Sequence, residues 1–316
     1  MNILFMGTPD FATASLAALL SAGKHVCAVV TQPDKARGRG MKVTFSDVKK
    51  YALEKGLPVL QPETLKNGAF LPALEEYKPD LIAVVAYGKI LPEYILNFPK
   101  YGCVNVHGSL LPKYRGAAPI QRAVLNGDTV SGVTTMRLDK GMDTGDMYFS
   151  ESVEIGENTT TGELFDTLAE IGGKLLVKTV DALETGSAVL TAQDHAVATH
   201  ADKITPEECL VDFSLPAREV HNRIRGLSPF PGAFSYLNGK TVKLYDSRLN
   251  DEKEQSAPFG TVLEASRDGV VVACGIGSVR LLSFKPEGKG MLSAADMVNG
   301  RKIADGMRFE TGKADE

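Results

Sequence analysis

The chain has 316 residues, of which 43% are hydrophobic and 23% are charged, and its formal net charge is −4. This length suits one large domain or two medium ones, and the charge excludes a general attraction to nucleic acid, so any such binding must come from local patches. No apolar run approaches the roughly 18 residues of a membrane span, and the apolar start is too short for a signal sequence, so we expect a cytoplasmic protein.

In the first half, short apolar runs alternate with segments of helical periodicity. The runs that predict strands lie at residues 2–7, 25–31, 57–61, 80–87 and 103–107, and helices are predicted between them, for example over 11–23 and 46–56. This alternation predicts an α/β fold, a parallel sheet with helices on both faces. In such sheets ligands bind beyond the carboxyl ends of the strands.

The second half changes character after one long helix. Thr160 to Glu163 resembles a capping box that opens a helix through about Leu183, which Gly186 terminates. Periodicity then fades, and the residues up to 206 are interpreted as a linker. Short strands separated by turns follow, with Asn238-Gly239 as a hairpin signal, which predicts a small barrel. We therefore expect a first domain over 1–189, a linker over 190–206 and a second domain over 207–316.

The strand at 103–107 carries the first candidate site residues. If Val104 and Val106 point into the interior, Asn105 and His107 project together from the opposite face, roughly 7 Å apart. A satisfied polar pair at a strand end is one interpretation. The other depends on residues 139–146, DKGMDTGD, which place three acids among two glycines after another apolar strand. Beside His107, such a loop supplies the parts of an acyl-transfer site: an oxyanion donor, an acid/base and a carboxylate.

Neither the spacing of the other histidines nor that of the cysteines predicts a metal site. The four cysteines lie in apolar settings, form no CxxC pair and are interpreted as buried free thiols. His25, His195, His200 and His221 have no neighbour at a metal-ligand spacing, so we interpret them as structural or surface histidines.

NVHGSLLPKYRGAAPI followed by DKGMDTGD closely resembles the core of the formyltransferases that use 10-formyltetrahydrofolate. The resemblance implies a catalytic triad of Asn105, His107 and Asp143. Three further segments narrow the resemblance to the members of this family that act on methionyl-tRNA. They are FMGTPDFA, TQPDKARGRGMK and DFSLPAREVHNRIRGLSPFPGAFS. The resemblance implies a Rossmann-like catalytic domain, a linker and a C-terminal domain with an OB-type barrel. One departure is the absence of tryptophan, with Phe213 and Phe230 at positions where the family has Trp.

The implied reaction transfers the formyl group to the α-amine of methionyl-tRNA, giving N-formylmethionyl-tRNA for translation initiation. Only the neutral amine is nucleophilic, and an α-amino group titrates near pH 8 or a little below. Asp143 is the candidate to accept a proton through water or to orient His107. Asn105 and His107 are candidates to stabilise the oxyanion, and His107 to protonate the leaving nitrogen. The sequence leaves the order of these proton transfers open.

The resemblance also implies residues that contact each substrate. Ser109, Leu110, Leu111 and Pro112 would contact the folate, although a hydrophobic plug over the sheet is an alternative. Lys113, Arg115 and Gly116 would lie near substrate phosphates.

Residues 31–50 carry six basic residues against two acidic ones, a local net charge of +4. By resemblance this loop enters the tRNA acceptor end, with Arg37, Arg39 and Lys42 as tRNA-binding residues, and the C-terminal domain also binds tRNA. A solvated loop is the alternative interpretation. The resemblance further implies a monomer.

Three functions are compatible with these observations. They are formylation of initiator methionyl-tRNA, formylation of a small amine such as a sugar nucleotide or glycinamide ribonucleotide, and non-catalytic RNA binding. The intact triad disfavours the third. The basic loop and the C-terminal barrel favour the first over the second, because a small amine requires neither.

Overall fold

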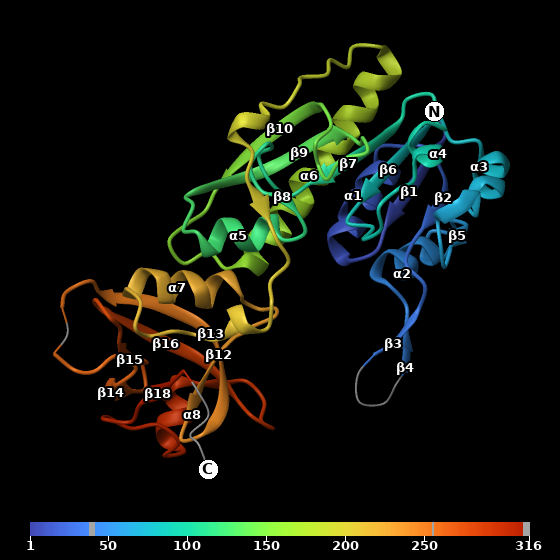
Figure 1. Ribbon diagram of the computed structural model, residues 1–316. Coiled ribbons are helices and arrows are strands. Elements are labelled where there is room, and N and C mark those ends of the chain that lie inside the picture. The colour runs from blue at the N-terminus through green and yellow to red at the C-terminus, as the bar shows by residue number, and fades with distance from the viewer. Residues whose placement is uncertain (38–41, 255, 312–316) are drawn as a thin grey trace. The chain divides into compact units, whose positions relative to one another are not determined.

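The computed structural model describes residues 1–37, 42–254 and 256–311, and these form two compact units (Figure 1). The first unit comprises residues 1–119, 131–153 and 165–201. The second comprises 120–130, 154–164 and the chain from 202 onward. Each unit is thus assembled from separate stretches of sequence. The domain boundaries expected from the sequence stay a prediction.

Most elements of the first unit belong to one open α/β layer structure. Up to residue 201 the helices and strands are β1 (Ile3–Gly7), α1 (Asp10–Ser21), β2 (Val26–Val30), β3 (Lys35–Arg37), β4 (Lys42–Thr44), α2 (Asp47–Glu54), β5 (Val59–Leu60), α3 (Leu71–Tyr77), β6 (Leu81–Val85), α4 (Glu93–Leu96), β7 (Cys103–His107), β8 (Arg115–Gly116), α5 (Pro119–Leu125), β9 (Val130–Arg137), β10 (Met147–Glu154), α6 (Thr161–Thr185) and β11 (His200–Ala201). The sheet order is β10-β9-β7-β6-β1-β2-β5. The five strands from β7 to β5 pair in parallel.

Helices cover both faces of this sheet. On one face, Gly172 of α6 lies so close to β7 that an added Cβ would be 2.8 Å from Cγ1 of Val106. On the other face, alternate residues of β1 and β6 join a buried cluster with α3 and α4, which contribute Leu74 and Ile95. Because β1 and β6 are buried along their whole length, they read as continuous apolar runs rather than as alternating ones. The predicted parallel sheet with helices on both faces is confirmed.

The helix α6 begins and ends where the sequence signals lie. The Thr160 N–H donates to Oε2 of Glu163 at 2.8 Å, and the Glu163 N–H donates to Oγ1 of Thr160 at 3.3 Å, which makes the capping box. Hydrogen bonds from the N–H and the hydroxyl of Thr160 to its carboxylate hold the pKa of Glu163 below its usual value. At the other end Gly186 takes a left-handed φ of +71° and donates to the carbonyl of Leu183.

The strand β9 runs antiparallel to β7, whereas β6, on the other side of β7, runs parallel to it. Arg137 at the end of β9 lies opposite Val104, and Thr134 lies opposite His107. The loop after β9 therefore starts beside the amino end of β7. Alignment of carboxyl ends, the usual arrangement in a parallel sheet, is not what brings residues 139–146 to His107.

The second unit is built on an antiparallel sheet that curls into a half-barrel. From residue 202 the helices and strands are α7 (Ala217–Gly226), β12 (Ala233–Leu237), β13 (Lys240–Asp251), β14 (Val262–Ser266), β15 (Gly269–Ala273), β16 (Ser278–Pro286), β17 (Leu292–Ser293), α8 (Ala294–Asn299) and β18 (Phe309–Glu310). The sheet order is β14-β15-β16-β13-β12-β18, with β17 paired to β16. The prediction of a small β-domain is confirmed.

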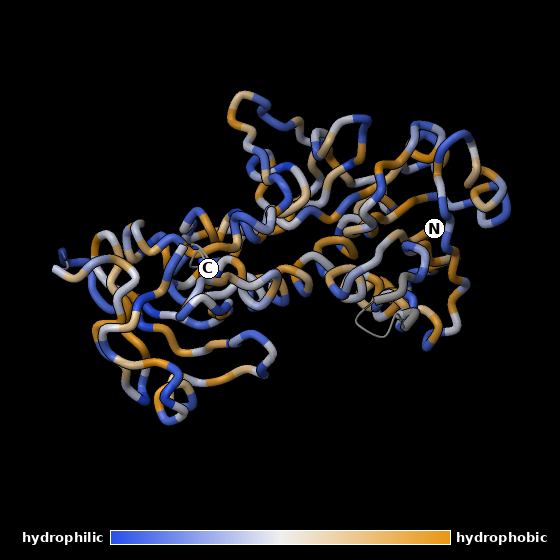
Figure 2. Tube along the Cα trace, turned by 60° about the horizontal axis from the view of Figure 1, so that its bottom comes forward, coloured by the Kyte–Doolittle hydropathy of each residue, from blue (hydrophilic) through white to orange (hydrophobic). Residues whose placement is uncertain are grey.

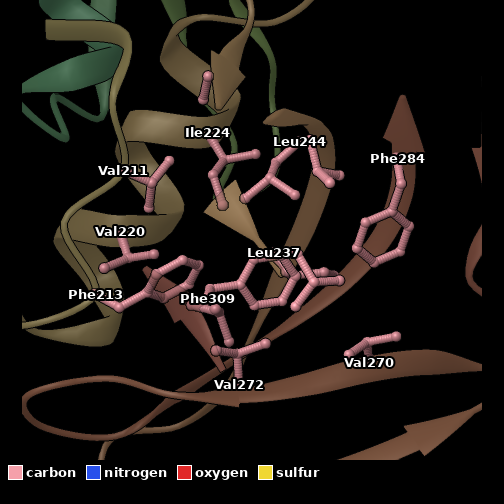
Figure 3. Close-up of a cluster of buried hydrophobic side chains, with 14 of the residues drawn as sticks. Val211, Phe213, Val220, Ile224, Leu237, Leu244, Val270, Val272, Phe284 and Phe309 are labelled. Carbon is pink, nitrogen blue, oxygen red and sulfur yellow. The ribbon is translucent and has the colours of Figure 1, made fainter. Parts of the chain in front are cut away.

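A single apolar core holds the second unit together (Figure 3). Val220 and Ile224, one helical turn apart on α7, point toward strand residues such as Leu244. Phe213 is buried against Phe309, with ring centroids 5.5 Å apart, whereas Phe230 is 78% exposed. The two phenylalanines at expected Trp positions therefore have different environments.

The predicted hairpin at Asn238-Gly239 joins β12 to β13. Both residues take left-handed φ angles, +51° and +70°, and Leu237 pairs with Lys240 across the two-residue turn. Such a turn favours Asn-Gly because glycine adopts this conformation without steric cost.

Hydrophobic and hydrophilic stretches alternate along the trace of each unit (Figure 2). Among the helices in the described residues, none is long and apolar enough to cross a membrane.

Candidate active site

Asn105 and His107 lie on one face of β7, as the pleat predicts. Val106 between them packs on α6, whereas the Cys103 thiol lies on the other face, 3.7 Å from the Ile95 carbonyl oxygen. His107 is buried, and Asn105 is half-buried. The amide and the imidazole are therefore presented side by side, away from the α6 side of the sheet.

The hydrogen bonds of His107 determine which ring nitrogen can take part in chemistry. Nε2 lies 2.9 Å from the carbonyl oxygen of Tyr114. Because a carbonyl only accepts, Nε2 carries the proton of the neutral ring. Nδ1 then presents a lone pair, and it lies 3.6 Å from Oδ2 of Asp143. The pair can hold one proton between an imidazole and a carboxylate, as a general acid/base requires.

The structure distinguishes the roles of two of the acids in the loop 139–146. Oδ1 of Asp139 accepts from the Gly141 N–H at 2.9 Å and from the Thr144 hydroxyl at 2.7 Å, so this carboxylate shapes the loop. Asp143 has a left-handed φ of +54°, and its Oδ2 accepts from the Gly116 N–H at 2.8 Å. Asp143 is thus the acid whose carboxylate faces His107.

The loop after β7 uses an unusual backbone to supply both contacts. Tyr114, whose carbonyl binds His107, has a φ of +60°, a conformation that costs a non-glycine residue about 1–2 kcal/mol. Gly116, whose N–H binds Asp143, has a φ of +124°, and an added Cβ would lie 2.8 Å from the Ala201 carbonyl oxygen. Strain of this kind is maintained only where the surroundings enforce it, and it concentrates at functional sites.

Residues 109–112, expected to contact folate, form a fixed turn over β9. The Ser109 hydroxyl donates to the Lys113 carbonyl at 2.6 Å, and Thr134 of β9 bonds to Ser109 and Leu111 backbone groups. Leu110 lies over Gly132. Pro112 follows Leu111, which is buried. The hydroxyl of Ser109 thus shapes the turn, and any contact with folate remains a prediction.

The side chain of Arg115 is buried and bonded within the site. This residue was expected near substrate phosphates, but its side chain is only 5% exposed. Its Nε and Nη2 donate to Oε1 of Gln193 at 3.1 and 2.7 Å, and Nη2 also donates to Nδ1 of His195 at 3.0 Å. His195, interpreted from sequence as an ordinary histidine, is thus next to a residue that supports the site.

Gln193 is the site residue that the sequence did not reveal. It lies in the stretch interpreted as a linker and is 5% exposed, whereas the residues on either side of it are exposed. Its Nε2 donates to the carbonyl oxygens of Asp143 and Gly145 at 2.9 and 2.7 Å. The stretch then continues into β11, which pairs with β8. No local pattern could have identified partners 50 residues away.

The basic segment after β2 forms a hairpin. β3 pairs antiparallel with β4, and Arg37 lies opposite Lys42, whereas Arg39 lies outside the described residues. Lys49 pairs with Asp34 and Lys50 with Asp47, at 2.5 and 2.9 Å. Two of the six basic residues of the segment are thus held by acidic side chains.

Across the described ranges, no group of three or more His, Cys, Asp or Glu side chains is placed to hold a metal ion.

Residues 1–180 match the family model described as Formyl transferase, and residues 203–302 match Formyl transferase, C-terminal domain. The methionyl-tRNA formyltransferase of Desulfotalea psychrophila is 48% identical over 303 residues, covering 96% of this chain and 94% of that protein. The one from Caldanaerobacter subterraneus subsp. tengcongensis is 47% identical over 307 residues, covering 97% and 99%.

Solved structures with the same fold include two formyltransferases. The sugar 3N-formyl transferase WlaRD, determined in the presence of dTDP and 5-N-formyl-THF, has a TM-score of 0.65 at 20% identity and covers 92% of this chain and 99% of its own. A methionyl-tRNA formyltransferase from Clostridium thermocellum has a TM-score of 0.55 at 19% identity, covering 80% and 95%. At these identities the likeness supports the fold alone.

The two domain matches and the near full-length relatives define a one-carbon transferase. The chain belongs to the formyl transferase family, within it to the methionyl-tRNA formyltransferases. The family and the formyl-transfer activity predicted from the sequence are thereby confirmed.

Proposed function

We propose that the chain transfers the formyl group of 10-formyltetrahydrofolate to the α-amine of initiator methionyl-tRNA, with Asn105, His107 and Asp143 as catalytic residues. The observation that carries this proposal is the 3.6 Å approach of His107 Nδ1 to Asp143 Oδ2, on the face of β7 that also presents Asn105. This arrangement supplies an amide donor, an imidazole and a carboxylate within one site, and it contains no protein nucleophile. It therefore suits direct attack by the substrate amine.

The reaction forms a bond between the α-nitrogen and the formyl carbon, and breaks the bond between that carbon and N10 of the folate. The amine loses one proton and N10 gains one. Nδ1 of His107 and the Asp143 carboxylate can hold the proton between these two steps. The Asn105 amide donates to the oxygen that becomes negative in the tetrahedral intermediate, where a single preorganised donor contributes about 10²- to 10³-fold in rate.

The folate is assigned to the turn formed by Ser109, Leu110, Leu111 and Pro112. Support comes from its position directly after His107 and from its fixed shape, since a preorganised apolar surface suits a flat pterin. The related WlaRD structure was determined with 5-N-formyl-THF, which is consistent with a folate co-substrate for the fold.

The tRNA is assigned to Arg37, Arg39 and Lys42 of the segment after β2 and to the predicted C-terminal domain, residues 207–316. Arginine and lysine side chains can contact phosphates, and arginine can stack on unpaired bases. A function in translation initiation further implies a cytoplasmic protein, and we propose that it acts as a monomer.

The decisive experiment compares acceptors in a filter assay with labelled 10-formyltetrahydrofolate. Charged initiator tRNA should become labelled, whereas a dTDP-amino sugar and glycinamide ribonucleotide should not. Labelling of either small amine in preference to the tRNA would replace this function with the alternative one. Asn105→Ala and His107→Ala serve as controls for the chemistry, because each should abolish labelling while the protein stays folded.

The tRNA assignment has a separate test. Arg39→Ala should reduce formylation of the tRNA much more than background formylation of a small methionine ester. An equal loss on both substrates would place Arg39 in the chemistry or in the fold instead.

A further inference from the structure

The backbone around Asp143 is held by one side chain. The carboxamide nitrogen of Gln193 donates to the carbonyl of Asp143 itself at 2.9 Å and to that of Gly145 at 2.7 Å. These two bonds use both N–H groups of the amide. One of the two accepting carbonyls belongs to Asp143 itself, whose φ of +54° is unfavourable for most side chains. Because the carbonyl of Asp143 is held, the peptide that follows Asp143 cannot rotate freely. The direction of the Cα–Cβ bond of Asp143 is then fixed as well.

The orientation of Gln193 is determined in turn by Arg115. The Arg115 guanidinium donates twice to Oε1 of Gln193, and an arginine can only donate, so the amide nitrogen must face the loop. Both side chains are 5% exposed, so water does not compete for these bonds. The main chain of Arg115 is itself fixed, because its N–H donates to the Thr199 carbonyl at 2.9 Å.

We propose that Gln193, oriented by Arg115, is a positioning residue for catalysis: it holds the carboxylate of Asp143 against Nδ1 of His107. This inference rests on the proposed function, because it takes Asp143 as the catalytic acid. It assigns a role to the stretch 190–201, which the sequence presents as a connection between domains. Gln193 acts through Asp143 and does not touch the reacting atoms.

A position defined this closely matters to the rate. The Asp143 carboxylate is otherwise anchored by the Gly116 N–H at 2.8 Å and lies 3.6 Å from Nδ1 of His107. Rotation of one peptide in the loop would move it out of reach of both. Catalytic groups must be held within about 0.5 Å of their productive geometry, and misplacement by 1 Å can cost about 10²-fold.

Two substitutions separate the contacts of Gln193. Gln193→Leu removes all of them. Gln193→Glu keeps the acceptor for Arg115 but turns a carboxylate oxygen toward the carbonyls of Asp143 and Gly145. We expect both to lower kcat about 10- to 100-fold with little change in the KM for tRNA or folate. Full activity of Gln193→Glu together with loss in Gln193→Leu would overturn the proposal, because the contact with Arg115 alone would then matter.

Gln61→Leu is the matched control. Gln61 has the same pattern of partners, since it donates to the Gln32 carbonyl and to Asp34 and accepts from Lys49. It makes none of these contacts with the loop 139–146. Loss of this amide should leave kcat unchanged, so an equal fall in both variants would show a general effect of losing a semi-buried amide.

The double variant that combines Gln193→Leu with Asp143→Asn tests whether Gln193 affects kcat only through Asp143. If Gln193 acts only through Asp143, adding Gln193→Leu to Asp143→Asn should lower kcat no further. Multiplicative losses would assign Gln193 a separate role and overturn the proposal. Arg115→Lys provides a second variant in case Gln193→Leu does not fold, and it should lose part of the same activity, because lysine cannot donate as a planar fork.

A readout that does not need turnover keeps this inference distinct from the proposed function. In Gln193→Leu, hydrogen exchange at the Gly116 amide should accelerate, because its acceptor is the carboxylate of Asp143. Unchanged exchange at Gly116 would overturn the positioning role even if kcat fell. If wild-type protein formylates no amine, the proposed function fails, while the exchange experiment still shows whether Gln193 holds the loop.

Discussion

The site segments of the first unit, residues 105–118, 139–146 and 193–201, are held by hydrogen bonds, whereas the face of α7 that carries Val220 and Ile224 is held by apolar burial in the second unit. His107 and Asp143 each depend on a backbone group supplied by another part of the chain. Val220 and Ile224 instead contribute fully buried side chains to a core shared with the curled sheet.

The two kinds of contact control different properties. A hydrogen bond contributes only about 0.5–1.5 kcal/mol net, but it fixes direction. A buried aliphatic side chain contributes about 1.5–3 kcal/mol and has little directional preference. Changes in the site loops should therefore affect kcat more than stability, and changes in the second core should do the reverse.

The largest expected effect is on the site-loop side. Asp143→Asn keeps the shape of the side chain and an acceptor for the Gly116 N–H, but it cannot accept a proton. We expect kcat to fall about 10²- to 10⁴-fold, while urea unfolding shows a change below about 1 kcal/mol. Asp146→Asn, an exposed acid in the same loop, is the control and should keep kcat within a few-fold. Near-normal turnover of Asp143→Asn would remove it from the mechanism.

Ile224→Ala, in the core of the second unit, should affect stability more than kcat. Ile224 is fully buried, so truncation leaves a cavity and should lower the free energy of unfolding by about 2–5 kcal/mol. At a temperature where the variant is folded, kcat on a small methionine ester should stay within a few-fold of wild type. Ile276→Ala, at a position 50% exposed, should cost less than about 0.5 kcal/mol. A large fall in kcat for Ile224→Ala would show that packing in the second core also controls the geometry of the site.

Much of the apolar framework was predictable because its signals are local. The strand at 103–107 has the bounds of β7, and its alternation placed Asn105 and His107 on one face. The capping box at Thr160 and the turn at Asn238-Gly239 each depend on residues within four positions of one another. Periodicity and turn chemistry report such short-range physics directly.

The polar part of the site was predictable in composition but not in geometry. The sequence showed that the loop 139–146 carries suitable acids after an apolar strand. It did not show that this strand, β9, is antiparallel to β7, so that the loop starts beside the amino end of β7. Arg115 was expected near substrate phosphates, but its side chain is buried and bonds to Gln193, which lies 78 residues away in the sequence. Hydrogen bonds at such separations depend on the complete fold, which no local pattern encodes.

His221 tests the comparison from within the apolar unit, because it is a buried polar residue. Its Nδ1 lies 2.8 Å from the Ser247 hydroxyl, and its Nε2 lies 3.0 Å from the Glu157 carbonyl oxygen. Burial lowers the pKa of His221 in the folded protein, although the hydrogen bond to Glu157 opposes this shift. The unfolded chain therefore binds this proton more readily.

Stability should consequently fall as pH drops below the ordinary value of 6.5, down to the lowered pKa, by at most about 1.4 kcal/mol per pH unit. Above that window this group adds no pH dependence. Urea unfolding between pH 5 and 8 measures the effect, with His221→Gln as the comparison, since glutamine can also donate to Glu157 and accept from Ser247. The difference between the two curves should change with pH only below about 6.5. Parallel curves would show that His221 is protonated equally in both states.

The smallest expected effect involves neither polar contacts nor burial. Gly239 has a φ of +70°, and nothing lies within 4 Å of a Cβ added there, so Gly239→Ala pays only for the left-handed backbone. We expect a loss of about 1–2 kcal/mol in the free energy of unfolding and no change in kcat on a small methionine ester. Gly290→Ala is the control, because it also has open space around the new Cβ but no left-handed φ. Alanine there should be neutral or slightly stabilising, since it restricts the unfolded chain. An equal effect at both positions would mean that the turn at Asn238-Gly239 relaxes to another geometry, and that backbone conformation at this hairpin contributes little to the stability of the second unit.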